Sequence, residues 1–115
     1  MVIKKKSSNL EDFATGSVWD YPMEGAPVGI SYQEHDGRVP EKGWGINTVC
    51  WEAFYVLDGN AEVYIDDEKD TIEKGDVVIL KPDQKSYLVA RKLKLLTITK
   101  PNWYKEQYQE VIKKP

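Results

Sequence analysis

The sequence predicts an all-β domain, an antiparallel barrel or sandwich, and three observations support that prediction. Short runs rich in β-branched and aromatic residues recur through residues 28–99. Gly, Pro, Asn or Asp stands at each break between the runs, as turns require. The runs follow one another about every ten residues, which is too close for the crossover connections of parallel strands.

An N-terminal arm is expected over residues 1–17, ahead of the barrel. Its start is polar and carries the basic run Lys4–Lys6, which we interpret as a solvated tail. Ser8-Asn9 is a capping signal for a short turn that would hold Leu10 and Phe13. Short extended segments are then predicted over residues 18–21 and 28–32, and a polar loop over residues 34–45.

The strongest strand signals lie in the second half of the core barrel, which we place at about residues 28–99. Alternation of side chains along a strand that starts at Ile46 assigns two faces to it. Strands are predicted over residues 46–57, 61–65, 71–72, 77–80, 87–90 and 93–99, with turns at 59–60, 66–67, 74–75 and 82–83. The inward face would hold Thr48, Cys50, Glu52, Phe54 and Val56, and the outward face Asn47, Val49, Trp51 and Tyr55.

A short helix is predicted at the C-terminal end, over about residues 102–112. Pro101-Asn102 is a helix-start signal. Residues spaced to share one helical face follow it, namely Tyr104, Gln107, Tyr108, Val111 and Ile112.

Length and charge narrow the class of protein. The chain of 115 residues has room for one domain, placed at 1–115, and its net charge is −3. That charge gives no general attraction to nucleic acid, and no apolar stretch is long enough to span a bilayer. A single cysteine excludes an intrachain disulfide. No secretory signal is visible, so a cytoplasmic location is expected.

Two ordered motifs resemble the paired signature of the cupin superfamily. The first runs from Glu52 to Gly59 and includes Tyr55-Val56-Leu57 before the glycine. The second is the Gly75-Asp76 start with its apolar strand up to Pro82. The resemblance covers about residues 45–99 and implies an antiparallel cupin or jelly-roll barrel, together with a homodimer.

The chain departs from the family at its metal ligands. Metal-binding cupins place a histidine pair before the glutamate and another histidine after the second motif. Those positions fall here at Ile46 and Thr48, or in a longer spacing at Gly45 and Asn47, and at Ser86. Of the usual ligands only Glu52 remains, so no cofactor is expected.

Glu52 is therefore the main candidate for function. Burial without a metal would raise its pKa, which suits a ligand anchor or an acid–base group, unless it is a hydrogen-bonded remnant. Cys50 is interpreted as a buried structural thiol, and Glu52, Cys50 and His35 as a low-ranked alternative metal set. The proposed ligand-binding residues are Trp44, Thr48, Cys50, Glu52, Phe54, Ser86 and Leu88, and the weak catalytic candidates are Glu52, Tyr32 and Tyr87.

The favoured function is metal-independent binding of a small sugar-like or carboxylate ligand inside the barrel. An isomerase or epimerase acting on a sugar or nucleotide sugar is the alternative, and a metal-dependent cupin ranks below both. Aromatic residues at the barrel mouth would stack on a flat ligand, or else seal the barrel end or a subunit interface. The expected partners are a small molecule and a second copy of the chain, with neither nucleic acid nor membrane.

Overall fold

The computed structural model describes residues 1–112, which form a single nine-stranded sheet with two short 3-10 turns. The elements are η1 (Lys5–Ser7), β1 (Asn9–Phe13), β2 (Gly16–Asp20), β3 (Gly29–Val39), β4 (Trp44–Asn47), β5 (Trp51–Ile65), β6 (Glu68–Glu73), β7 (Val77–Leu80), β8 (Lys85–Lys100), η2 (Lys105–Gln107) and β9 (Tyr108–Val111). No helix in this described part is long and apolar enough to cross a membrane.

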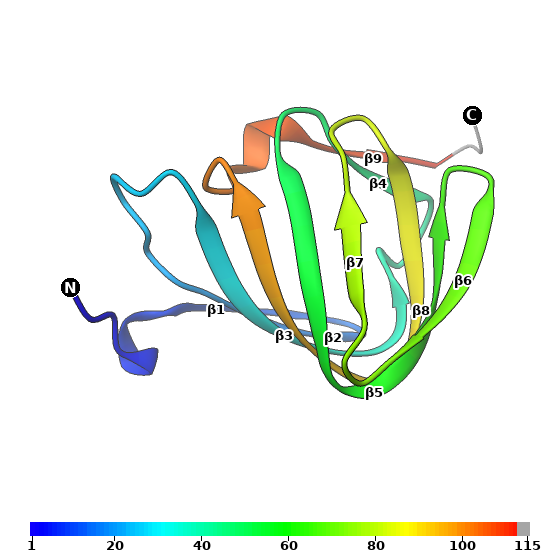
Figure 1. Cartoon of the computed structure of the whole chain (residues 1–115), viewed down its shortest axis with the longest axis horizontal. Coiled ribbons are helices and arrows are strands. Elements are labelled where there is room, and N and C mark those ends of the chain that lie inside the picture. The colour runs from blue at the N-terminus through cyan, green and yellow to red at the C-terminus, as the bar shows by residue number, and fades with distance from the viewer. Residues whose placement is uncertain (113–115) are drawn as a thin grey trace.

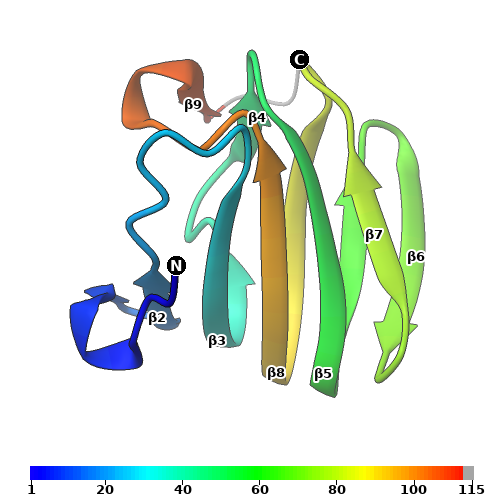
Figure 2. The same cartoon turned by 60° about the vertical axis from the view of Figure 1, so that its left-hand side comes forward.

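Every strand pair is antiparallel, and β5 and β8 form the centre of the sheet. β8 pairs with β5 along one edge and with β3 and β4 along the other, while β5 also pairs with β6 and β7. The sheet curls so far that β5 and β8 each descend one wall of a barrel and rise in the other (Figure 1). Figure 2 shows β3, β8, β5 and β7 side by side as one wall. The predicted antiparallel all-β barrel is confirmed.

The barrel bends where β-bulges interrupt neighbouring strands at the same level. The pairing of β3 with β8 shifts between His35 and Gly37, and that of β5 with β8 shifts on both sides of Asp58. Gly59 and Lys92, at φ 78° and 46°, have the left-handed backbone that such bulges use. The turn predicted at Gly59-Asn60 is therefore a bend within one long strand. Even-numbered side chains such as Val56 face inward before it, and odd-numbered ones such as Ala61 face inward after it.

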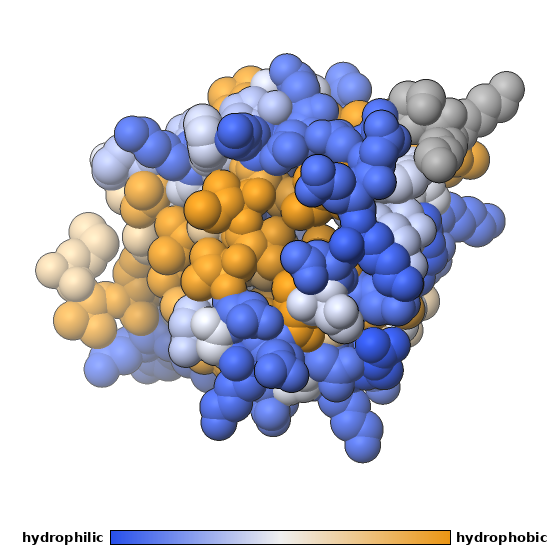
Figure 3. All heavy atoms as spheres, turned by 45° about the vertical axis from the view of Figure 1, so that its right-hand side comes forward, coloured by the Kyte–Doolittle hydropathy of each residue, from blue (hydrophilic) through white to orange (hydrophobic). Residues whose placement is uncertain are grey.

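The apolar core is formed by side chains of β5, β6, β7 and β8. Leu93, Leu95 and Val56 are almost wholly enclosed there. The remaining core members are Phe54, Ala61, Val63, Ile72, Val78, Leu80 and Ala90, with Ile65 and Leu88 packed against them. Hydrophobic residues also reach the surface, Val77 and Ile79 of β7 among them, and Figure 3 shows a broad hydrophobic area on this face.

The N-terminal segment is more ordered than the sequence predicts. In place of a capped turn and a tail, residues 9–13 form β1 and pair with β2, which pairs with β3. Likewise β3 continues to Val39 through the segment predicted to be a loop. Cross-strand pairing of Leu10 with Trp19 and of Trp19 with Tyr32 extends the sheet. The assignment of one domain to residues 1–115 stays a prediction.

The predicted C-terminal helix over residues 102–112 is wrong. Only Lys105–Gln107 make a 3-10 turn, which lacks a side-chain cap, and Tyr108–Val111 form β9. β9 pairs with β4, from Trp44 opposite Val111 to Asn47 opposite Tyr108. Pairing with the free edge of β4 gives the backbone more hydrogen bonds than a short, weakly capped helix would, so tertiary contacts override the helical spacing.

Candidate functional site

A row of polar side chains lines the inside of the β3–β8 wall. Ser31, Gln33 and His35 alternate on β3, and the register sets Ser31 opposite Thr97 on β8. His35 Nε2 donates to Gln33 Oε1 at 2.8 Å, and Gln33 Nε2 donates to Ser31 Oγ at 3.0 Å. Because strand side chains alternate, these groups face the same interior as Leu93 and Leu95. The barrel thus has a polar half next to its apolar half.

Glu52 continues this polar row on the neighbouring strand β5. The register pairs Glu52 with Thr99 on one side and with Leu80 on the other. The residue is partly exposed, whereas its carboxyl group lies deep, and burial raises the pKa of that carboxyl. Asn47 Nδ2 donates to Glu52 Oε1 at 2.8 Å, a bond that favours the carboxylate and partly opposes the shift.

Hydrogen bonds from the C-terminal segment fix the orientation of the Asn47 side-chain amide. Asn47 Oδ1 accepts hydrogen bonds from Gln107 Nε2 at 2.8 Å and from Trp103 Nε1 at 3.2 Å. Its Nδ2 therefore points to Glu52, since an amide oxygen and nitrogen lie on opposite branches. Residues 103–107 thus help to position the Glu52 carboxyl.

Gln107 also accounts for a break in the predicted strand at Ile46. Its side-chain Oε1 accepts the backbone N–H groups of Val49 and Cys50, at 3.2 and 3.1 Å. Its backbone carbonyl accepts both the N–H and the hydroxyl of Thr48. β4 consequently ends at Asn47 and β5 begins at Trp51. The prediction that side chains alternate without interruption from Ile46 to Val56 is therefore wrong. As a result Asn47, which was predicted to face outward, contacts Glu52.

Three buried polar atoms in the described residues have no hydrogen-bond partner. They are the hydroxyls of Thr97 and Thr99 and Nδ1 of His35. Buried polar groups are nearly always paired, so each such atom calls for an explanation such as a water or a bound molecule. The two hydroxyls lie on β8, where Thr99 pairs with Glu52 and Thr97 with Phe54 of the neighbouring strand β5. Sequence reasoning missed them, although Thr97-Ile98-Thr99 shows the alternation of a strand with one polar face.

Tyr108, which the sequence reasoning placed on a helix, is a half-buried residue of β9 next to β4. A side chain on Gly45 would collide with its ring, so the tyrosine lies over Gly45 on the inner side of β4. Its hydroxyl donates to Glu110 Oε2 at 3.2 Å. Burial, Glu110 and the charge of Glu52 all raise the pKa of Tyr108. It is therefore a neutral hydroxyl donor near Glu52.

The other predicted site residues are dispersed. Cys50 is fully buried, its thiol donates to the Pro101 carbonyl at 3.5 Å, and burial together with Glu52 raises its pKa. Phe54 belongs to the apolar core below Glu52. Ser86 and Leu88 lie at the other end of β8, opposite Ile65 and Val63. Ser86 and Leu88 therefore lie at the opposite end of the β5–β8 pair from Glu52.

The predicted tyrosines lie on the sheet face opposite the core. Tyr87 stacks on Tyr64 at 4.3 Å, meets Trp44 edge-on at 4.7 Å and lies under Arg38. Tyr32 donates to Glu34 at 2.7 Å, and burial and Glu34 raise its pKa to about 12. Because their strand neighbours face inward, neither tyrosine shares the interior with Glu52.

The donors present do not fit a metal centre. Within residues 1–112, no group of three His, Cys, Asp or Glu residues is placed to hold an ion. The alternative set of Glu52, Cys50 and His35 is therefore not assembled. His35 contacts Gln33, Cys50 contacts Pro101 and Glu52 contacts Asn47.

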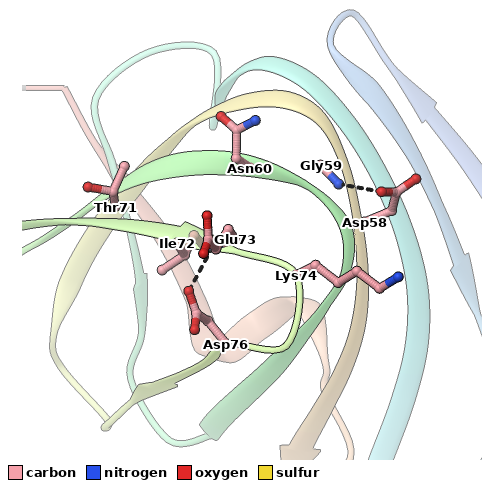
Figure 4. Close-up of a pocket in the computed structure, with 8 residues that line it drawn as sticks. All are labelled: Asp58, Gly59, Asn60, Thr71, Ile72, Glu73, Lys74 and Asp76. Carbon is pink, nitrogen blue, oxygen red and sulfur yellow. Dashed lines mark hydrogen bonds between the residues drawn. The ribbon is translucent and has the colours of Figure 1, made fainter.

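A cavity of about 660 Å³ lies away from Glu52, at the bulge of β5 and the β6–β7 turn. Figure 4 shows two hydrogen bonds within its lining: Asp58 accepts the Gly59 N–H and Asp76 accepts the Glu73 N–H. Its carboxylates are exposed, and it contains no unpartnered buried group. We therefore favour the polar half of the barrel as the functional site.

Comparison with solved structures identifies the fold. A variant of Streptomyces PAC13 with uridine superposes with a TM-score of 0.86 at 11% identity, covering 96% of this chain and 89% of that one. A second structure of Pac13, described as a nucleoside dehydratase, gives 0.87 at 11% identity, over 97% and 91%. The fold is that of the cupin superfamily. The resemblance seen in the two sequence motifs is confirmed at the level of this cupin fold.

Oxalate decarboxylases match over a smaller part of their length. A mutant of the Bacillus subtilis enzyme gives a TM-score of 0.80 at 12% identity, covering 92% of this chain and 31% of that chain. The Lactobacillus farciminis enzyme, in a formate complex, gives 0.77 at 15%, over 92% and 34%. This chain thus spans about a third of the length of those enzymes. No protein-family model and no curated protein sequence matches the chain.

Proposed function

We propose that this cupin-fold protein binds a small, neutral, hydroxyl-bearing molecule in the polar half of its barrel without using a metal. The observation that carries the proposal is the pair of unpartnered hydroxyls, Thr97 and Thr99, on the strand next to Glu52. A ligand with its own donors and acceptors would satisfy these groups, whose burial without partners is costly. The site is a set of adaptable hydroxyl, amide and carboxyl groups.

The charges of the interior favour a neutral ligand over a carboxylate. Among residues 1–112 no lysine or arginine is buried. Burial lowers the pKa of His35 to about 4, so this histidine is neutral at physiological pH. A ligand carboxylate or phosphate would therefore be desolvated next to Glu52 without a compensating cation. Of the two ligand classes expected from the sequence, the sugar-like one is the better supported.

Nucleosides are the first class to test. Streptomyces PAC13, whose structure superposes over most of both chains, has been seen with uridine. A nucleoside carries ribose hydroxyls and a flat base but no formal charge, which matches the interior described above. Uridine and uridine monophosphate then form a matched pair that differs by a charged group.

We expect Thr99→Val to weaken uridine binding about tenfold, because it removes a hydroxyl while preserving side-chain shape. Isothermal titration of the wild type and the variant measures this change. Thr71→Val is the matched control, since Thr71 is exposed on β6, and it should leave the affinity unchanged. Uridine monophosphate should bind more weakly than uridine. Equal affinities for Thr99→Val and wild type, or tighter binding of the phosphate, would contradict the proposal.

An isomerase- or epimerase-type enzyme is the second candidate. The raised pKa of Glu52 favours it, because an acid–base group operates best when its pKa lies near the working pH. Tyr108 supplies a neutral hydroxyl on the same inner surface. Tyr32 and Tyr87, which the sequence offered for this role, lie on the opposite face of the sheet.

Glu52→Gln separates the two candidates. The amide keeps an oxygen that accepts from Asn47 and a donor in place of the carboxyl proton, so uridine affinity should stay within about threefold of wild type. If the protein only binds its ligand, neither the wild type nor Glu52→Gln forms a product. If it is an enzyme that uses Glu52, the variant still binds uridine but loses turnover. Calorimetry with a product assay by mass spectrometry measures both. Loss of binding above about tenfold would show that the charge itself anchors the ligand, against the neutral-ligand proposal.

Two predictions from the sequence stay predictions, a cytoplasmic location and a homodimer. The first can be checked by fluorescence microscopy of a tagged chain. The second is developed below from the surface of the molecule.

A further inference from the structure

The edge of β7 differs from every other sheet edge in the described residues. The edge strands β1, β6 and β9 carry exposed charges, for example Glu11 and Asp12 on β1 and Glu110 on β9. Charged side chains on an edge prevent further strand addition. β7 pairs only with β5 and holds Val77, Val78, Ile79 and Leu80, with no charged residue. Its edge therefore has no such protection.

The backbone at this edge is available for pairing. Val56 N–H donates to the Asp76 carbonyl, so the backbone groups of residue 76 point to β5. Backbone groups alternate along a strand, and those of Val77 and Ile79 must therefore point away from β5. An antiparallel partner in which Val77 faces Ile79 of the other copy would satisfy both residues. That arrangement is self-complementary, as a two-fold axis requires.

The outward side chains beside this edge make an apolar surface. Val77 and Ile79 are each 57% exposed. Cross-strand register continues the surface from Ile79 through Ala53 to Ile98, and from Val77 through Tyr55 to Leu96. Trp51 and Leu57 on β5 extend it and are also exposed. Figure 3 shows a hydrophobic area bordered by hydrophilic residues above, below and on the right.

The area agrees with what a dimer needs. A standard interface buries about 800 Å² on each partner, about a ninth of the 7373 Å² surface of this chain. The exposed parts of Trp51, Tyr55, Leu57, Val77, Ile79 and Ile98 supply about 500 Å² of apolar surface. Polar residues around the area can supply the remainder, as the rims of protein interfaces do.

We propose that the β7 edge and the adjoining outer face of β5 and β8 form the interface of a symmetric homodimer. The occupant is a second copy of this chain, paired antiparallel along β7. The interface lies on the outer face of the wall whose inner face holds Glu52 and Thr99. Ligand binding inside the barrel does not require it, so failure of one proposal leaves the other untouched.

Light scattering coupled to size exclusion tests the proposal, from about 1 μM to about 1 mM protein. The wild type should have twice the 13.2 kDa chain mass, and Ile79→Lys should be monomeric because it introduces a charge at the interface. Leu10→Lys is the control, since Leu10 is equally exposed on the β1 edge, and it should remain dimeric. Val77→Lys repeats the test if Ile79→Lys fails to give a folded circular dichroism spectrum.

Either of two outcomes overturns the proposal. A wild type that is monomeric at all concentrations would mean that this face receives a different partner or none. A dimer that persists in folded Ile79→Lys or Val77→Lys would place the contact on another surface.

Discussion

Replacing Gly59 with alanine is expected to cost at least about 4 kcal/mol of unfolding free energy, or to prevent folding. Gly59 has φ 78°, which L-residues with a Cβ disfavour. A Cβ there would also collide with the backbone carbonyl oxygens of Lys92 and Arg91 on β8. Backbone atoms in a paired strand cannot rotate away, so the bend shared by β5 and β8 would have to open. Urea denaturation followed by circular dichroism measures the loss.

Gly75→Ala is the matched control for this prediction. Gly75 also has a positive φ, 93°, but nothing lies within 4 Å of the position its Cβ would occupy. Only the backbone preference is lost, about 1 kcal/mol. Equal losses for the two variants would show that φ alone matters and that the close approach of β5 and β8 at Gly59 is not what the fold depends on.

The free energy of unfolding should fall by about 3 kcal/mol as the pH is lowered from 6.5 to 4, through His35 alone. Burial lowers the pKa of folded His35 from 6.5 to about 4. Between these values the unfolded chain binds a proton that the folded chain does not, so acid stabilises the unfolded state. His35 Nε2–H donates to Gln33, and protonation would add a charge at the unpartnered Nδ1.

Comparison with His35→Gln isolates this contribution. Glu52 has the opposite sign, since burial raises its folded pKa and its share of stability falls as pH rises. Both proteins contain Glu52 and the surface carboxylates, so the difference between their pH profiles reports His35. The variant should be the less stable at pH 7 but lose less stability on acidification. Parallel profiles from pH 7 to 4 would mean that His35 is not held neutral by the barrel.

The barrel could be predicted because its signals are local. The segments Glu52–Gly59 and Gly75–Pro82 each combine an apolar strand with a glycine at the position where the backbone must bend. Strand alternation and turn residues need no knowledge of distant partners. The predicted turn at 59–60 and the break between the predicted strands 87–90 and 93–99 are instead bends within β5 and β8, because both strands keep pairing across them.

The site was less predictable because its contacts join distant segments. Glu52 was found through its motif, but its partner Asn47 was assigned to the outer face. The break that turns Asn47 inward depends on Gln107, about sixty residues further along. Helical spacing in residues 104–112 concealed β9, whose formation requires the free edge of β4. No local pattern in a single sequence contains that information.

The division of the interior connects fold to function. Phe54, Val56 and Leu95 make the apolar half, which stabilises the barrel. The polar half lies at the end where the C-terminal segment crosses the sheet, with Gln107 and Trp103 holding Asn47 against Glu52. Unpartnered hydroxyls in such a place reduce stability. The unpartnered hydroxyls are explained most simply if a ligand completes their hydrogen bonding.

A crystal structure of the protein with uridine tests the central claim most directly. The ligand is predicted inside the barrel, with hydroxyls within about 3 Å of Thr97 or Thr99 and with Glu52 beside it. The same crystal examines the cavity of about 660 Å³ at the β6–β7 turn. Uridine found in that cavity, or an interior closed by side chains with Thr97 and Thr99 paired to other protein groups, would contradict the account.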